Sequence, residues 1–338
     1  MKWNWVEHVS KASAGIANAV LVTLGIGLLF ESFGGLLGWE AFVTIGGATK
    51  MLLAPALGAG IAYQLGGNTL VIFSAMACST IGGAAIHQTS EGAFTIVTGQ
   101  PISAVLAAVV ATIVGKWVIG RTKLDMVAIP FAAILVGGVS GVCLAAVTTP
   151  LIQKLSAAIT ASVQGSPLIA PMVISLVFSM LLMSPASSAA IAMALQLDPV
   201  SSAAALIGCT IQFVGFTVMS MKQNDLGGFL AQSLITPKVQ FPNIVKNPLL
   251  IIPPFVAAII CAPIATLGFD FQVSYEIAGL GLNSLIAPIN IVSTQGVSAF
   301  LIYMATGVVL PIAITLGLYK AVKIVGWVKV GDLRMEIQ

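Results

Sequence analysis

The chain has 338 residues, of which 58% are hydrophobic and only 7% are charged, with a net charge of +3. Soluble domains carry about 25% charged residues, so this composition excludes a water-soluble globular protein, and so small a net charge excludes a nucleic-acid-binding surface. The mean hydropathy of +1.05 and several apolar windows of roughly 20 residues indicate a protein that spans a membrane. Because the apolar runs are long rather than alternating, they favour helices over barrel strands.

The amino-terminal residues carry Trp3, Trp5, Glu7 and His8 ahead of the first apolar run. They contain no small-residue cleavage site, so we expect no removable signal peptide and a retained first span. Hydropathy then predicts nine spans, over residues 12–30, 41–64, 68–87, 101–119, 126–147, 168–195, 200–221, 248–269 and 299–320.

Basic residues predict the orientation of these spans, because Lys and Arg concentrate in cytoplasmic loops. They cluster before the first span, after the fourth and after the last, at Lys2, Lys11, Lys116, Arg121, Lys123, Lys320, Lys323, Lys329 and Arg334. Nine crossings would put the basic carboxyl terminus outside, so either another segment crosses or one enters and leaves on the same side. The short candidates are 151–163, 226–239 and 277–291. Non-helical backbone at membrane depth typically marks a substrate site, which favours the second half of the chain.

The chain is expected to form a single polytopic membrane domain over 1–338, because its hydrophilic ends are too short for a soluble domain. Within it we predict an amino-terminal helix bundle over 1–148, an interfacial helix or linker over 149–166, a substrate-binding half with hairpins over 167–326 and a cytoplasmic tail over 327–338. The segment 151–162 is either an amphipathic helix along the interface or an extension of the fifth span.

The densest polar run covers residues 212–246 and supplies most candidate solute ligands. These candidates are Gln212, Asn224, Asp225, Gln232, Asn243 and, just beyond the run, Asn247. Carboxamides both donate and accept hydrogen bonds, which suits neutral hydroxyl-bearing solutes. Lys222 and Lys246 are supporting charges. Lys222 and Asp225 would pair on a helix, or are an ordinary loop pair.

A second group of candidates, Glu276, Asn283 and Asn290, belongs to a Gly-rich segment near the carboxyl terminus. Its glycines would let the backbone approach a ligand closely, or the segment merely seals the bundle. The run 184–188 contains Pro185 and should interrupt the sixth span, as a gating kink or as packing.

His87 and Glu91 are supporting candidates, because four residues would put them on one helical face if the third span continued. They could instead be a simple interfacial pair. No metal is expected, since neither residue has further ligands at suitable spacing. The cysteines Cys78, Cys143, Cys209 and Cys261 lie in apolar runs and should be small core residues. Without nucleotide, metalloprotease or redox motifs, we expect no autonomous catalytic site and no cofactor.

Three motifs, VMSMKQNDLGG (218–228), PNIVKNP (242–248) and GLGLNSLIAPI (279–289), resemble a known family. They are similar to the EIIC membrane component of the sugar phosphotransferase system, in the branch that contains the perfringolysin O regulator family. The resemblance implies an all-α membrane protein of about ten transmembrane helices with short re-entrant hairpins, dimeric and moving its solute by an elevator-like shift. It carries over Lys222, Asn224, Asp225, Asn243, Lys246 and Asn247 as the family's polar run.

These observations predict a permease component that binds a small polar solute, such as a sugar, in the cytoplasmic membrane of a bacterium. Both termini should be cytoplasmic, and phosphate would come from separate EIIA and EIIB subunits. The alternatives are a membrane-embedded ligand sensor without transport and an H⁺-coupled secondary transporter.

Overall fold

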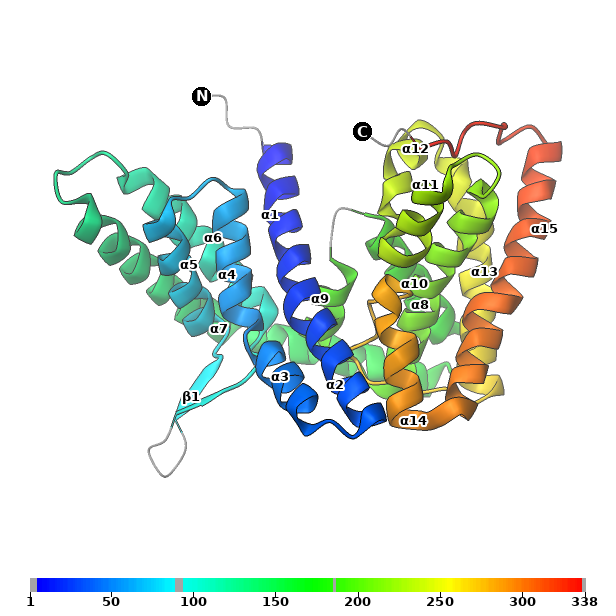
Figure 1. Ribbon diagram of the computed structural model, residues 1–338, viewed down its shortest axis with the longest axis horizontal. Helices are drawn as coiled ribbons and strands as arrows, with labels where there is room; N and C mark the ends of the chain where they lie inside the picture. Colours follow the sequence, from blue (N-terminus) through cyan, green and yellow to red (C-terminus); the bar gives the residue numbers. More distant parts are fainter. Residues whose placement is uncertain (1–4, 89–93, 185–186, 336–338) are drawn as a thin grey trace. The chain divides into compact units, whose positions relative to one another are not determined.

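The computed structural model describes residues 5–88, 94–184 and 187–335, and most of them are helical (Figure 1). The chain forms two compact units. Unit 1 comprises residues Met1–Leu155 with Met193–Leu195, and unit 2 comprises Ser156–Ala192 with Gln196–Gln338. Each unit has its own buried core, so the two are treated separately below.

The predicted fold class, an all-α membrane protein, is confirmed. Within the described residues, six helices are long and apolar enough to cross a membrane, and a bent pair of helices adds a seventh. Two of the six, Asp125–Gly165 and Asn283–Ile324, have 41 and 42 residues, about twice what one crossing needs. The second of them is broken at Gly296, whose φ of 82° and ψ of −176° are not helical. Three shorter apolar helices accompany these spans.

Unit 1 contains a long first span, a bent pair, two packed helices and a small hairpin. Its elements are α1 (Trp5–Val20), η1 (Leu21–Gly25), α2 (Ile26–Leu37), α3 (Glu40–Met51), α4 (Leu53–Gln64), α5 (Thr69–Gly82), β1 (Ile86–Gln88), β2 (Phe94–Ile96), α6 (Pro101–Val118) and most of α7 (Asp125–Gly165). Side chains define two helix starts: the Asn68 carboxamide accepts from Val71 N, and the Gln100 carboxamide accepts from Ser103 N.

The predicted single span 41–64 is instead two helices, α3 and α4, that meet at Leu52 with a bend of 57°. Pro55 explains the break, because it has no N–H to donate to the carbonyl of Met51 four residues earlier. The pair α2 and α3 packs closely, since Gly27 and Gly46 leave no side chain between the two backbones.

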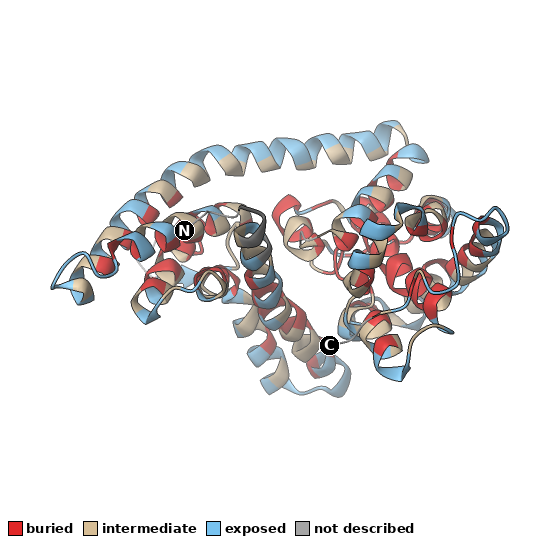
Figure 2. Ribbon diagram, turned by 90° about the horizontal axis from the view of Figure 1, so that it is seen from above, coloured by how far each residue is buried: buried red, intermediate tan, exposed pale blue. Residues whose placement is uncertain are grey.

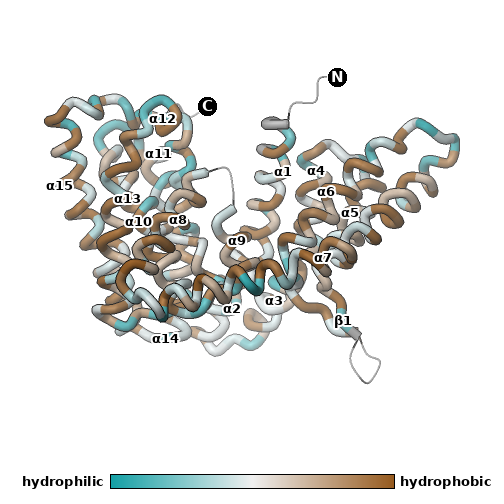
Figure 3. Tube along the Cα trace, turned by 180° about the vertical axis from the view of Figure 1, so that it is seen from behind, coloured by the Kyte–Doolittle hydropathy of each residue, from teal (hydrophilic) through white to brown (hydrophobic). Residues whose placement is uncertain are grey.

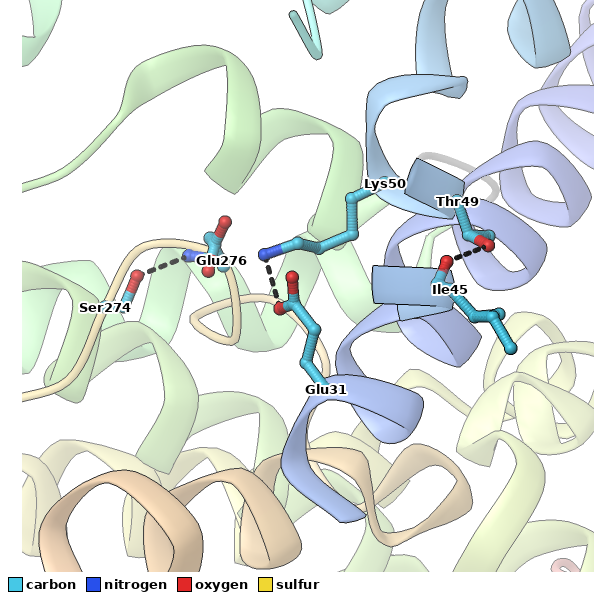
Figure 4. Close-up of polar contacts among 6 residues, drawn as sticks. All are labelled: Glu31, Ile45, Thr49, Lys50, Ser274 and Glu276. Atoms are coloured by element: carbon cyan, nitrogen blue, oxygen red, sulfur yellow. Dashed lines mark hydrogen bonds and ion pairs between the residues drawn. The ribbon is translucent and has the colours of Figure 1, made fainter. Parts of the chain in front are cut away.

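An ion pair joins these two helices (Figure 4). The Lys50 ammonium lies 2.6 Å from the Glu31 carboxylate, and the two side chains are only 17% and 26% exposed. A pair this poorly solvated is costly to break, because each charge has lost much of its water in forming the pair.

The expectation that His87 ends a helix is wrong. The helix α5 stops at Gly82, and His87 lies in β1, which pairs antiparallel with β2. A helical face shared with Glu91 therefore does not exist at His87, and Glu91 itself lies outside the described residues.

The segment 151–162 is the continuation of one helix rather than a separate one, because α7 runs without interruption through Pro150 to Gly165. Much of α7 is exposed (Figure 2), including Cys143. That cysteine is therefore not in the core, whereas Cys78, Cys209 and Cys261 are buried as expected.

Unit 2 is built around one helix, α10 (Pro199–Ser220), whose residues are almost all buried. Asp198 starts this helix by accepting hydrogen bonds of 3.1 Å from Val200 N and Ser201 N. The helices α8 (Ile169–Met183), α13 (Ile252–Pro263) and α15 (Leu310–Ile324) pack against it. Along the chain the other elements are α9 (Ser188–Leu195), α11 (Leu226–Leu230), η2 (Ala231–Ile235), η3 (Pro237–Gln240), α12 (Phe241–Lys246), η4 (Pro248–Ile251), η5 (Ile264–Gly268), η6 (Asn283–Leu285), α14 (Ile286–Met304) and η7 (Ala305–Val309).

Candidate functional site

The sixth predicted span is interrupted where expected. Helix α8 ends at Met183, Ser184 is extended, and α9 begins at Ser188. The Ser187 hydroxyl starts α9 by accepting a 3.3 Å hydrogen bond from Ala190 N. Pro185 and Ala186 lie outside the described residues. This interruption provides one stretch of non-helical backbone in the apolar part of unit 2.

A second stretch lies between α11 and α12, in what we call the first hairpin, residues 226–246. Its two halves, α11 with η2 and η3 with α12, are separated by Thr236, whose φ of −166° and ψ of 135° are extended. The Thr236 hydroxyl accepts a 3.3 Å hydrogen bond from Lys238 N and so fixes the start of η3. None of these helical pieces is long enough to cross a membrane alone.

A third stretch, which we call the second hairpin, covers residues 274–285 and precedes α14. Gly281 has a φ of +59°, and the non-glycine residues Ser284 and Leu285 have φ values of 49° and 57°. Left-handed backbone is unfavourable for residues with a side chain and is typical of functional sites. The second hairpin is therefore held by its surroundings rather than by its own propensity.

The three stretches meet on α10, at a place that we call the junction. The Ser188 hydroxyl donates a 2.8 Å hydrogen bond to the Gly279 carbonyl, so α9 is joined to the second hairpin. Gly281 lies against the Phe213 ring of α10. The η2 segment contacts η6, and η3 packs on α8 and α10. Breaks far apart in the sequence are therefore neighbours in space.

Gln212 lies on α10 and is fully buried. Its Nε2 donates to Ser179 Oγ at 3.0 Å and to Gly208 O at 3.3 Å. Its Oε1 has no hydrogen-bond partner in the part of the chain that the structure describes. A buried acceptor of this kind is costly and needs an explanation.

The remaining candidates lie in the second hairpin and in α14, which follows it. Ser284 Oγ donates to the Asn283 carboxamide at 2.9 Å, and the Glu276 backbone N–H donates to Ser274 Oγ at 3.3 Å (Figure 4). Asn290 belongs to α14 and is half-buried. Asn283 is thus the candidate amide that the sequence places directly in the second hairpin.

The amides of the polar run are brought together, but at the ends of the first hairpin. Asn224 precedes it and Asn243 lies in its last helical turn, and both bind residues 327–335, which we call the C-terminal segment. Asn224 Nδ2 donates to Leu333 O and Asn243 Nδ2 to Arg334 O, both at 3.0 Å. Hydrophilic residues gather at this end of unit 2, around α11 and α12 (Figure 3).

A cavity of about 780 Å³ lies between these amides and the C-terminal segment. Its lining contains five of the predicted site residues or supporting charges, together with residues from the segment: Gln223, Asn224, Asp225, Asn243, Lys246, Asn247, Gly331, Asp332, Arg334 and Met335. Cavities of roughly 300–1,000 Å³ accommodate small molecules, so this polar cavity is a second place where a solute could be held.

Gln232 does not line this cavity, because it is fully buried inside the first hairpin. Its Nε2 donates to Ser220 Oγ at 3.0 Å, and its Oε1 accepts from Gln240 Nε2 at 2.6 Å. The structure does not place Lys222 and Asp225 on one helix, where the sequence would have let them pair. Lys222 is exposed in the turn after α10, and Asp225 starts α11 by accepting a 2.8 Å hydrogen bond from Gly228 N.

Sequence reasoning did not select Gln223, Gln240 or the C-terminal segment as parts of the site. Gln223 and Gln240 stand inside the same polar run, so their composition was a usable signal. The partners of these glutamines, about 90 to 110 residues further along the chain, left no local signal in the sequence.

Comparison with family models finds that the one described as "Phosphotransferase system, EIIC" matches residues 10–335. This match covers nearly the whole chain and confirms the resemblance to the EIIC component that the three motifs indicate. A search of curated proteins found no match to the chain.

Proposed function

The chain belongs to the EIIC family of the phosphotransferase system, and from this premise we propose that it binds and translocates a small polar solute, such as a sugar, at the junction. As an EIIC protein it is a multi-pass membrane permease component that works with other components of the system.

The observation that carries this proposal is the meeting of three non-helical stretches on α10. Unpaired backbone groups are tolerated at membrane depth only where protein buries them or a cavity exposes them to polar partners. Transporters place such broken segments around their solute. Here the Ser188–Gly279 hydrogen bond and the contact of η2 with η6 bring them together.

The chemistry at the junction suits hydroxyl groups. Asn283 offers an amide donor and acceptor, and the two hairpins supply backbone groups that are free of regular helical pairing. Carboxamides bind either end of a hydroxyl hydrogen bond. We therefore propose a neutral polyhydroxy solute, with Asn283 as a direct ligand and Gln212 and Glu276 as further contacts.

The setting proposed for this activity is the cytoplasmic membrane of a bacterium, with both termini cytoplasmic and two copies of the chain forming a dimer. The three basic clusters that the sequence shows support this orientation. Phosphate for the solute would be supplied by separate EIIA and EIIB subunits, which act on the cytoplasmic face.

Thermal unfolding of the purified protein against a panel of sugars and sugar-like metabolites tests the proposal. A ligand that binds only the folded state raises the unfolding midpoint, and the stabilisation grows with the logarithm of ligand concentration above the dissociation constant. We expect at least one panel member at millimolar concentration to raise the midpoint, and the same compound to be taken up by proteoliposomes. No stabilisation by any compound would contradict the proposal, and binding without uptake would favour a sensor.

A further inference from the structure

The hydrogen bonds that hold the C-terminal segment 327–335 involve mainly its main chain. Gln223 Oε1 accepts from Gly331 N at 2.9 Å, and Asn224 Oδ1 accepts from Met335 N at 2.8 Å. Leu333 O accepts from Gln240 Nε2 at 3.1 Å as well as from Asn224. The segment is turned, since Arg334 N donates to Gly331 O at 3.0 Å, and the carboxamide side chains bind its peptide groups by donating and accepting hydrogen bonds.

These carboxamides come from both ends of the first hairpin. Gln223 and Asn224 precede it, whereas Asn243 lies in its last helical turn and donates to Arg334 O. Asn247, immediately after it, donates to Trp327 O and to Asp332 Oδ2, each at 3.0 Å. The C-terminal segment therefore ties the entry of the first hairpin to its exit.

Two apolar side chains anchor the segment, because Val328 and Leu333 are buried in a cluster that includes Phe216 and Leu250. Gly331, between these two side chains, and Arg334, after them, are exposed. The cavity of about 780 Å³ lies alongside, so the peptide is bound in a groove with space beside it. Hydrogen bonds from amides to peptide groups can be replaced by water at small net cost.

We propose that the five carboxamides of Gln223, Asn224, Gln240, Asn243 and Asn247 form a binding site for a peptide in a turn conformation, and that its ligand is the C-terminal segment, which acts as a separable latch on the first hairpin. With the segment bound, the two ends of the hairpin are held together. With the segment released, the hairpin gains freedom to move.

The latch reaches the junction through the first hairpin itself. The buried pair Gln240 and Gln232 links the Leu333 carbonyl to the interior of the hairpin, and η2 contacts η6 at the junction. Release of the segment is thus expected to change the mobility of backbone that we propose binds solute. The inference concerns the hairpin and does not require that the solute be a sugar.

Hydrogen–deuterium exchange of the full chain in lipid nanodiscs tests the latch. The test variant is N224A/N243A, which removes one amide at each end of the hairpin. The control is Q272A, because the exposed Gln272 side chain donates a hydrogen bond to Asp270, two residues away. We expect backbone exchange in residues 226–246 and 328–335 to rise about tenfold in the test variant, with α10 unchanged, because local opening is independent of global unfolding.

A second variant that ends at Gly326 removes the latch, and a synthetic peptide of residues 327–338 is then added to it. We expect the peptide to restore slow exchange in the first hairpin. Unchanged hairpin exchange in both variants would overturn the proposal, as would faster exchange of α10 together with the hairpin, which would show a general stabilising role. Failure of the peptide to restore slow exchange would show that the segment is not a separable ligand.

Discussion

The hydroxyl of Ser188 donates a hydrogen bond of 2.8 Å to the carbonyl of Gly279, across 91 positions of sequence. This contact joins the interruption after α8 to the second hairpin. Gly279 permits it, because a Cβ at that position would collide with the Ser188 backbone. This contact therefore predicts that adding a single methyl group at Gly279 lowers the stability of unit 2.

Replacing Gly279 with alanine should destabilise unit 2 by about 1–3 kcal/mol, the usual cost of forcing an extra methyl group into a packed site. Gly317 is a matched control on α15, because a Cβ there meets nothing within 4 Å, and alanine favours a helix. Thermal unfolding in detergent measures both variants. Equal midpoints for the two would show that the second hairpin does not pack against Ser188 as described.

Gln232 should be the most costly amide of the polar run to remove. It is fully buried and bonds Ser220, Thr217 and Gln240. Gln232→Leu leaves these partners with fewer hydrogen bonds, at a cost of about 1–3 kcal/mol. The exposed Gln272→Leu should change stability by less than about 0.5 kcal/mol. Chemical unfolding compares the two, and a neutral Gln232→Leu would mean that the buried network is not formed.

Gln212→Met separates a structural role from a binding role. Methionine has nearly the same length, the Ser179 hydroxyl keeps its bond to Gly208 O, and the substitution removes an acceptor that has no partner among the described residues. Stability should therefore remain within about 1 kcal/mol of the wild type. If Gln212 contacts the solute as proposed, this variant should bind it with a larger dissociation constant than the wild type. Unchanged affinity would remove Gln212 from the site.

The ion pair between Glu31 and Lys50 makes a prediction for unit 1. Glu31→Gln should cost about 1.5–3 kcal/mol, the range for hydrogen bonds to charged groups, because both side chains are mostly buried. The exchanged pair E31K/K50E should recover part of that loss if the two charges act on each other. A double-mutant cycle of unfolding midpoints isolates the coupling, and zero coupling would contradict a direct pair.

Parts of this fold were predictable because one sequence signal dominated. The span 200–221 corresponds to α10 at Pro199–Ser220, since a proline at its start and a continuous apolar run define it. The bend at Leu52 was missed because Pro55 stands within an apolar run and was not used as a helix breaker. His87 was assigned to a helix because hydropathy alone cannot separate the end of α5 from a short strand.

The site was predictable only in its composition. The amide-rich run and the Gly-rich segment were recognised as unusual backbone in an apolar chain, and the break at 184–188 was identified from its proline and serines. Which of these meet in space was not predictable, because Ser188 and Gly279, or Asn224 and Leu333, are joined by long-range contacts. Three of the amides that we predicted for a solute, Asn224, Asn243 and Asn247, are found bonded to the C-terminal segment, which no local pattern indicates.

The most direct test of the central claim, that solute binds at the junction, compares two exposed or half-buried carboxamides of unit 2. The solute that stabilises the wild type is titrated by isothermal calorimetry into N283A and Q272A. The Asn283 carboxamide accepts from Ser284 Oγ, and the Gln272 carboxamide donates to Asp270. The Gln272 carbonyl, which Q272A keeps, accepts from Gln295. The account predicts at least about tenfold weaker binding to N283A, as expected when a buried polar contact to the solute is lost, and wild-type binding to Q272A. Equal affinity of N283A and the wild type would contradict it.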